Sequence, residues 1–163
     1  MQCADLTTVT TFDASRFEAP ENIAIDRENN MFVSLLLSNQ VRKITPAGLQ
    51  STYATFDGAP GSLTSGLVID DDTGDLYVAY NPAGQNPAVY VVHPDQSKQM
   101  VAAFPIGAGL NGMTPDDRGN LFLADAFLGV VWRVAGAPGQ LAVTRRAFPP
   151  SIVRRTNPFQ GIQ

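Results

Sequence analysis

The sequence predicts an all-β protein that forms about three four-stranded blades of a β-propeller, expected to be half of a six-bladed ring. One short pattern occurs three times, about 45 residues apart, a period typical of four-stranded propeller blades. Short apolar segments alternate with turns rich in Gly, Pro, Asn and Asp, which indicates strands. No segment has the apolar spacing of an amphipathic helix. The copies of the pattern span residues 20–33, 64–78 and 110–123.

The first copy predicts a complete blade over residues 20–56. Asn and Asp tolerate positive φ and bond to their own backbone, so the polar segment from Asp26 to Asn30 is expected to be a hairpin turn between the first two strands. Residues 41–44 alternate between apolar and polar, which is typical of a half-buried strand. The expected strands are residues 22–25, 31–37, 41–44 and 52–56.

The second and third copies predict two further blades, over residues 64–104 and 110–147. Their expected middle and outer strands are residues 76–80, 88–92 and 100–104 in the second blade, and residues 121–124, 130–134 and 141–147 in the third. The whole chain, residues 1–163, is therefore interpreted as a single propeller segment.

Both ends of the chain carry parts of further blades. Leu6 to Phe12 is predicted to be a strand without inner strands of its own, as in a closing outer strand of a last blade. Residues 148–163 are interpreted as a linker and the start of a fourth blade. Propellers have four to eight blades, so three blades do not close a ring. Either the chain is the front part of a longer protein, which we favour, or a homodimer completes a six-bladed ring.

Composition narrows the classes of function. The chain has 163 residues, with 11 Lys and Arg against 15 Asp and Glu, so we expect no nucleic-acid partner. No apolar run is long enough to cross a bilayer, and we expect no membrane partner. The first residues lack the features of a signal peptide. The protein is therefore either cytoplasmic or exported with its signal peptide removed.

The repeats resemble those of one propeller family. Residues 20–26 and 110–113, each followed by an Asp-rich turn, resemble the gluconolactonase, regucalcin and luciferin-regenerating-enzyme family of six-bladed propellers, and residues 116–125 resemble its turn-plus-strand element. Strictosidine-synthase-like and NHL-type propellers share the repeat more loosely. The resemblance implies metal-dependent hydrolysis of a sugar lactone or a related cyclic ester, with a small molecule as substrate.

The resemblance also implies site residues at the starts of the innermost strands. Glu21 and Asn111 correspond to metal ligands of the family, and Asn111 and Ser65 lie at its substrate-binding positions. Calcium is the expected metal, with zinc or manganese as alternatives. Gln160 stands where the fourth blade of the family has an Asn. The later Asp, which the family uses as ligand and base, has no counterpart, so the catalytic residue is unknown.

Two other classes of function stay open. One is a non-catalytic propeller that binds a small molecule or a protein on its channel face, and the other is a lyase or synthase of the strictosidine-synthase type. The acidic segment from Asp70 to Asp75 lacks the length and the final Glu of an EF-hand loop, so it is expected to be a hairpin turn. His93 has no identifiable Ser partner for a catalytic triad.

Overall fold

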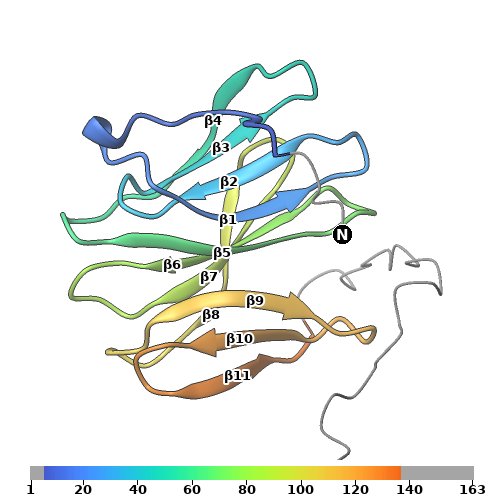
Figure 1. Ribbon diagram of the computed structural model, residues 1–163. Helices are drawn as coiled ribbons and strands as arrows, with labels where there is room; N and C mark the ends of the chain where they lie inside the picture. Colours follow the sequence, from blue (N-terminus) through green and yellow to red (C-terminus); the bar gives the residue numbers. More distant parts are fainter. Residues whose placement is uncertain (1–5, 137–163) are drawn as a thin grey trace, which may run out of the picture.

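The computed structural model describes residues 6–136, which form three antiparallel sheets (Figure 1). Blade 1 contains β1 (Pro20–Ile25), β2 (Met31–Leu35), β3 (Gln40–Ile44) and β4 (Gln50–Thr55). Blade 2 contains β5 (Leu63–Ile69), β6 (Leu76–Asn81), β7 (Ala88–Val92) and β8 (Lys98–Ala103). Blade 3 contains β9 (Leu110–Pro115), β10 (Leu121–Asp125) and β11 (Val130–Val134).

The predicted all-β fold of three propeller blades is confirmed. Within the described residues, the single helical segment is the short 3-10 turn η1 (Ala14–Arg16), and no helix could cross a membrane. The predicted outer strand of blade 3, residues 141–147, lies outside the described residues, as do residues 148–163. Residues 6–12 are described and form no strand. Their pairing with a further blade stays a prediction.

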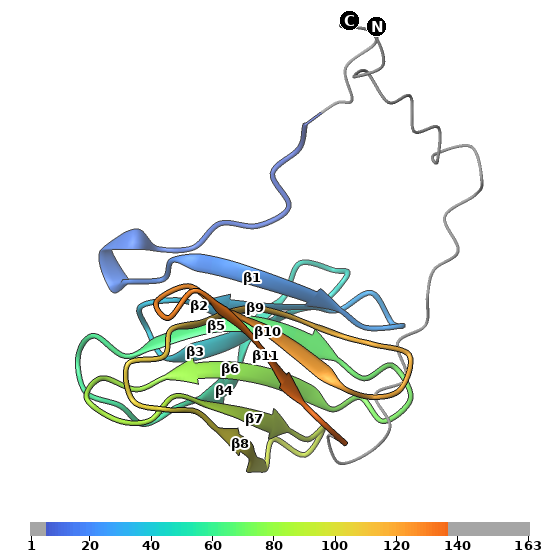
Figure 2. The ribbon, with the colours of Figure 1, turned by 90° about the horizontal axis from the view of Figure 1, so that it is seen from below.

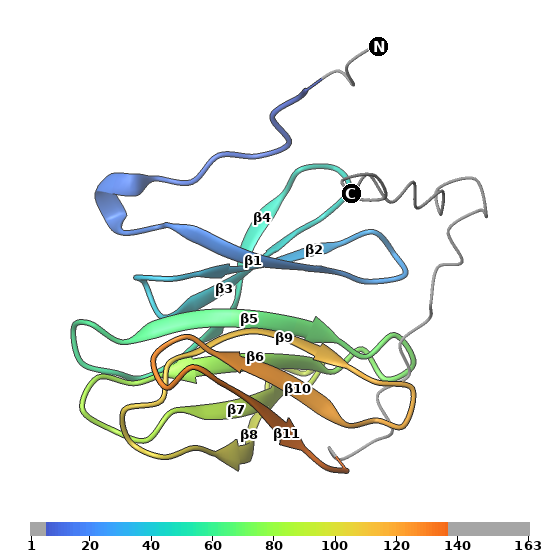
Figure 3. The ribbon, with the colours of Figure 1, turned by 60° about the horizontal axis from the view of Figure 1, so that its bottom comes forward.

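The three sheets lie side by side like the blades of a fan. The innermost strand of each blade contacts the innermost strand of the next, so that β5 lies between β1 and β9 (Figure 3). Figure 2 shows β1 at one side of the molecule and the outer strand β8 at the other. The strand starts of β1, β5 and β9 therefore meet on the side that faces the channel axis of a propeller.

Each hairpin between the first two strands of a blade is held by an Asp at the same place. The Oδ1 atom of Asp26 accepts hydrogen bonds from the backbone N–H groups of Glu28 and Asn30. Asp116 accepts the corresponding bonds in blade 3, and Asp70 accepts two in blade 2. These local bonds are the reason that Asp favours turns. The segment from Asp70 to Asp75 is the hairpin turn that the sequence predicted.

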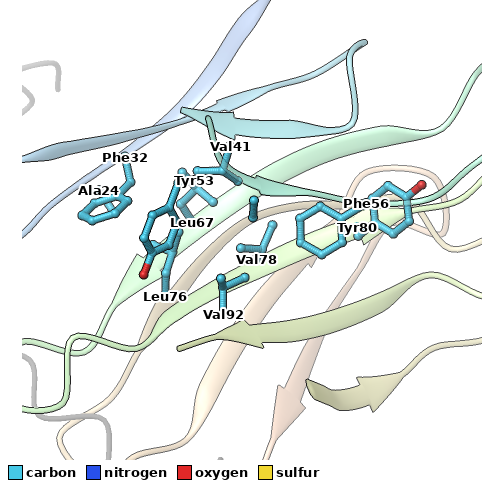
Figure 4. Packing of buried hydrophobic residues seen from close by; sticks show 11 residues of the cluster. Ala24, Phe32, Val41, Tyr53, Phe56, Leu67, Leu76, Val78, Tyr80 and Val92 are labelled. Carbon is cyan, nitrogen blue, oxygen red and sulfur yellow. The ribbon is translucent and has the colours of Figure 1, made fainter. Parts of the chain in front are cut away.

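Apolar side chains fill the two spaces between neighbouring blades. Between blades 1 and 2, Val41, Leu76 and Val78 are completely buried and Phe32 packs edge-on against Tyr53 (Figure 4). Between blades 2 and 3, a second cluster includes Tyr77 and Leu123. Burying one such side chain contributes about 1.5–3 kcal/mol. The apolar residues that recur along the strands thus pack between neighbouring blades and hold them together.

Hydrogen bonds across the blades fix the innermost strands relative to one another. The amide of Asn22 accepts a bond from Leu67 N–H, which joins β1 to β5. The amide of Asn81 bonds with both backbone groups of Leu110, at 2.8 and 2.9 Å, which joins blade 2 to β9. The relative position of the three strand starts is therefore set by specific bonds as well as by packing.

Parts of the segment before β1 contact the face of blade 1 that points away from blade 2. Phe12 packs against a cluster formed by Val33, Leu35 and Ile44. Glu18 forms an ion pair of 2.6 Å with Arg42, and both side chains are largely shielded from solvent. This segment thus covers part of an apolar blade face.

Candidate functional site

A pocket of about 210 Å³ lies at the channel side of the strand starts, and it brings together the three residues that the sequence singled out. Its polar lining comes from Glu21 of β1, Ser65 of β5, Asn111 of β9 and Asn81 of β6. Apolar side chains complete the lining; they include Leu36, Leu63, Leu110 and Phe127. The correspondence of strand starts that the repeats implied therefore holds in three dimensions.

Glu21 is the one carboxylate among the described residues that line this pocket. It is the second residue of β1, and its side chain makes no hydrogen bond or ion pair with any residue that the structure describes. The residue as a whole is exposed, and burial of part of its side chain at the pocket raises the pKa of this carboxyl above its ordinary value. A carboxylate that is partly desolvated and unpaired gains from a ligand that offers a positive charge or a hydrogen-bond donor.

Asn111 is the second residue of β9, and its side chain is exposed. Its position depends on the glycine at the corresponding strand of blade 2. A Cβ atom at Gly66 would lie 2.2 Å from the carbonyl oxygen of Asn111, so β5 and β9 approach each other more closely than any other residue would permit. This contact places Asn111 next to blade 2 and at the pocket.

Ser65 lines the pocket but uses its hydroxyl for the fold. The residue is 3% exposed, and its Oγ donates to the carbonyl oxygen of Leu110 at 2.7 Å. The amide of Asn81 donates to the same Oγ at 3.3 Å. Ser65 therefore links blade 2 to blade 3, and its contact with a substrate stays a prediction.

Asn81 and Phe127 are pocket residues that the sequence reasoning missed. Asn81 is the last residue of β6 and corresponds to Ala126 after β10, so the repeat offered no polar counterpart that could have drawn attention to it. Phe127 follows β10 and is 72% exposed. A Cβ atom at Gly109 would lie 2.5 Å from the ring of Phe127, so a glycine lets this ring lie flat on the backbone at the pocket.

Asp125 is buried near the pocket, but its oxygens are already used. Burial alone would raise the pKa of Asp125, and hydrogen bonds reverse that effect and lower it to about 2. The donors are the backbone N–H groups of Leu128, Gly109 and Phe127 and the indole N–H of Trp132. Asp125 therefore organises the loop after β10 rather than serving as a free ligand.

The pocket supplies the right kind of donor for calcium but too few donors. Calcium takes six to eight oxygen ligands. Glu21 and Asn111 supply one carboxylate and one amide, and no group of three or more His, Cys, Asp or Glu residues among residues 6–136 could hold a metal ion. The part of the chain that the structure describes therefore does not form a complete metal site.

A second, larger pocket of about 360 Å³ lies at the opposite ends of the strands, between the hairpin turns of blades 1 and 2. Acidic residues line it, but Asp26 and Asp70 bond to their own turns. Arg27 and Asp72 form an exposed ion pair of 2.6 Å across it. Nearby, the Nδ1 atom of His93 lies 2.8 Å from Asp75, which is a pair between two turns and not a triad.

Comparisons with known proteins identify the fold and not the family. No family model matches the chain, and no curated protein matches its sequence. Among solved structures, a chain of a nidogen/laminin complex is similar with a TM-score of 0.58 and 20% identity over 76% of this chain and 46% of its own length. A virginiamycin B lyase from Staphylococcus aureus is similar with a TM-score of 0.57 and 16% identity, over 72% and 41%.

The chain thus spans less than half of the length of either structure. Identities of this size carry the fold alone, and the two names cover a protein in a binding complex and an enzyme. The chain is a portion of a β-propeller.

Proposed function

We propose that this chain forms the channel-side binding site of a propeller and binds a small polar molecule between Glu21 and Asn111. The observation that carries the proposal is the unpaired carboxylate of Glu21 in a pocket of about 210 Å³. Ligand pockets typically combine an apolar lining with a few polar groups that fix orientation. Here the Glu21 carboxylate accepts hydrogen bonds and the Asn111 amide can both donate and accept.

The side chains around the pocket favour a ligand with an apolar ring face and polar edges. Phe127 offers an exposed ring beside the pocket, and Leu36 and Leu63 supply apolar contacts. The raised pKa of Glu21 makes its carboxylate a stronger proton acceptor than an ordinary Glu. A hydroxylated ring, such as that of a sugar lactone, fits this combination.

Hydrolysis of a sugar lactone is the enzymatic form of this proposal. Glu21 and Asn111 would be the ligands of a divalent cation, which supplies polarisation of a carbonyl when it is bound. The remaining ligands would have to come from outside the described residues. The same pocket could serve a lyase, the class named for one of the similar structures.

Ligand binding is tested by melting curves. We expect calcium chloride, a six-membered aldonolactone, or both together to raise the melting temperature of the 163-residue chain, since a ligand stabilises the state that it binds. Glu21→Gln should abolish the increase, whereas Glu28→Gln, which changes an exposed turn residue, should retain it. No shift with any of these probes, manganese and zinc included, would contradict the proposal.

Product analysis separates the two enzyme classes. Hydrolysis adds one water to a lactone, whereas a lyase breaks the ring without adding one, so mass spectrometry of the product distinguishes them. Binding without turnover would favour the non-catalytic alternative.

A further inference from the structure

Residues 10–12 lie where the outer strand of a blade preceding blade 1 would lie, although the described residues include no such blade. Outer strand β4 ends in Thr55 and is followed by Phe56, and the same pair occurs as Thr11-Phe12. The first residue of each outer strand donates a side-chain hydrogen bond to a backbone carbonyl of the outer segment that precedes it in the chain. The side chain of Lys98 in β8 donates to the carbonyl oxygen of Thr55, and the side chain of Gln50 in β4 donates to that of Thr11 at 3.1 Å.

The phenylalanines of these two pairs also correspond. Phe56 is 5% exposed and packs in the cluster between blades 1 and 2. Phe12 packs against the opposite face of blade 1. The segment that contains Phe12 therefore occupies the same position relative to blade 1 that β4 occupies relative to blade 2. The three inner strands of the blade to which this segment would belong are not among the described residues.

The face of blade 1 on which Phe12 packs has the residues of a contact between blades, but no blade packs on it among the described residues. Leu67 of β5 packs against blade 1 and is 4% exposed, whereas its counterpart in β1, Ile23, is 58% exposed. The two residues correspond because each lies two positions before the last residue of its strand. The face of blade 1 is thus built to receive another blade.

The face of blade 3 that points away from blade 2 exposes the apolar position that would pack against a following blade. In blades 1 and 2, Val41 and Val89 occupy corresponding positions and are completely buried by the neighbouring blade. Their counterpart in blade 3, Val131, is 71% exposed. This face continues the contact pattern that blades 1 and 2 present to their neighbours.

Blade 3 also has a free edge for a strand. The third strands of blades 1 and 2, β3 and β7, each pair with an outer strand, whereas β11 is an edge strand among the described residues. Val130 on this edge is 42% exposed. An exposed apolar edge strand favours pairing with a further strand.

We propose that two copies of this chain close one ring, in which residues 6–12 of each copy form the outer strand of blade 3 of the other copy. Blade 1 of one copy then packs against blade 3 of the other, as blade 2 packs against blade 1. With a two-fold axis, the exposed faces of blades 1 and 3 are covered in both copies, and the β11 edge of each copy pairs with a strand of the other. The exchanged strand takes the place that the sequence predicted for residues 141–147.

The repeat fixes the register of the exchanged strand. In blade 1, Ala54 pairs with Val41 and Thr55 with Gln40. By correspondence, Thr10 of one copy lies opposite Val131 of the other, and Thr11 lies opposite Val130. Directly opposite residues of an antiparallel pair have Cβ atoms about 4.5–5.5 Å apart. Cysteines at these places can therefore be linked to each other.

Closure would also complete the channel. The second copy adds its own Glu21 and Asn111 at the same end of the axis, so the pocket would be lined by both copies. The dimer itself does not depend on ligand binding, and its tests below measure mass and pairing only.

The first test is the mass of the 163-residue chain in solution, measured by light scattering and sedimentation equilibrium over a range of concentrations. We expect twice the mass of one chain. Val131→Glu should reduce the mass to that of one chain, because it places a charge in the contact between copies, whereas Gln99→Glu on the exposed outer strand β8 of blade 2 should not. A monomer at every concentration would overturn the proposal, and would favour closure by further blades of a longer chain.

The second test distinguishes exchange of residues 6–12 from other dimers. With Cys3 replaced by Ser, a Thr11→Cys chain is mixed with a Val130→Cys chain and oxidised or treated with a short thiol cross-linker. We expect a covalent pair that contains one chain of each kind. The matched control, Ser51→Cys mixed with Val130→Cys, should give none. A dimer without this cross-link would contradict the exchange of residues 6–12, because the β11 edge would then be unpaired or paired with residues of the same chain.

Discussion

At the scale of single residues, the sequence reasoning found carboxylates and amides by position but could not assign their partners. Glu21 and Asn111 reach the pocket because they start corresponding strands. Ser65 holds the corresponding position in β5, yet it donates its hydroxyl to Leu110. That bond depends on the distance between blades 2 and 3, which no spacing within one repeat specifies. A site residue and a residue that joins blades therefore look alike in sequence.

Asp125 shows how a buried acid serves the loop beside the pocket, and it leads to a prediction about pH. Its pKa of about 2 in the folded state lies below the ordinary value of 3.8 for an Asp side chain. Its contribution to the free energy of unfolding is therefore complete above about pH 4 and is lost as the pH falls toward about 2. Asp125→Asn has no such titration, and its amide would face the indole N–H of Trp132.

We expect Asp125→Asn to lower stability at pH 7 by about 1–3 kcal/mol, because one buried donor loses its acceptor. Denaturant unfolding at pH 7, and melting temperature from pH 6 to pH 2.5, measure the two effects. The difference between wild type and variant should narrow at the acid end, which separates Asp125 from the other acids. A constant difference across the range would contradict the lowered pKa.

At the scale of strands and turns, the pattern of the sequence was sufficient for most elements. Residues 88–92 and 130–134 are strands with the predicted bounds, because apolar runs between clear turn residues leave little choice. The strand β2 ends at Leu35 rather than at residue 37, since a turn begins there that the apolar residues Leu36 and Leu37 conceal. Residues 6–12 have the composition of a strand but pair with no strand in the described chain.

The approach of β5 to β9 gives a prediction with a matched control. A Cβ atom at Gly66 would meet the backbone of Asn111 at 2.2 Å, whereas one at the corresponding Gly112 would meet nothing within 4 Å. We expect Gly66→Ala to cost about 1–3 kcal/mol of stability, as overpacking does. In single copies, compared in the Val131→Glu background, Gly112→Ala should be neutral or slightly stabilising.

Denaturant unfolding of both variants measures this difference. Because Asn111 moves with β9, Gly66→Ala should also weaken any ligand response at the pocket more than Gly112→Ala does. Equal stabilities of the two variants would show that the contact between β5 and β9 is not tight in solution.

At the scale of the whole molecule, the blades differ in how many neighbours support them. Blade 2 contributes to both apolar clusters between blades, and Tyr77 and Val89 within it are completely buried. Within the described chain, blades 1 and 3 each pack against one neighbouring blade only. In repeat proteins stability is approximately a sum of the units and of the contacts between neighbours. Stability should therefore be greatest in the middle of the chain.

Hydrogen exchange measures this distribution directly. In dilute solution we expect the slowest exchange in β6 and β7 and faster exchange in β11, whose Val130 and Val131 are exposed. If two copies exchange residues 6–12, protection of β11 and of residues 6–12 should rise together with protein concentration, while β6 and β7 stay unchanged. Val131→Glu should remove this concentration dependence. Protection that is uniform across the three blades would mean that the chain opens as one unit and that the exposed faces of blades 1 and 3 do not limit its stability.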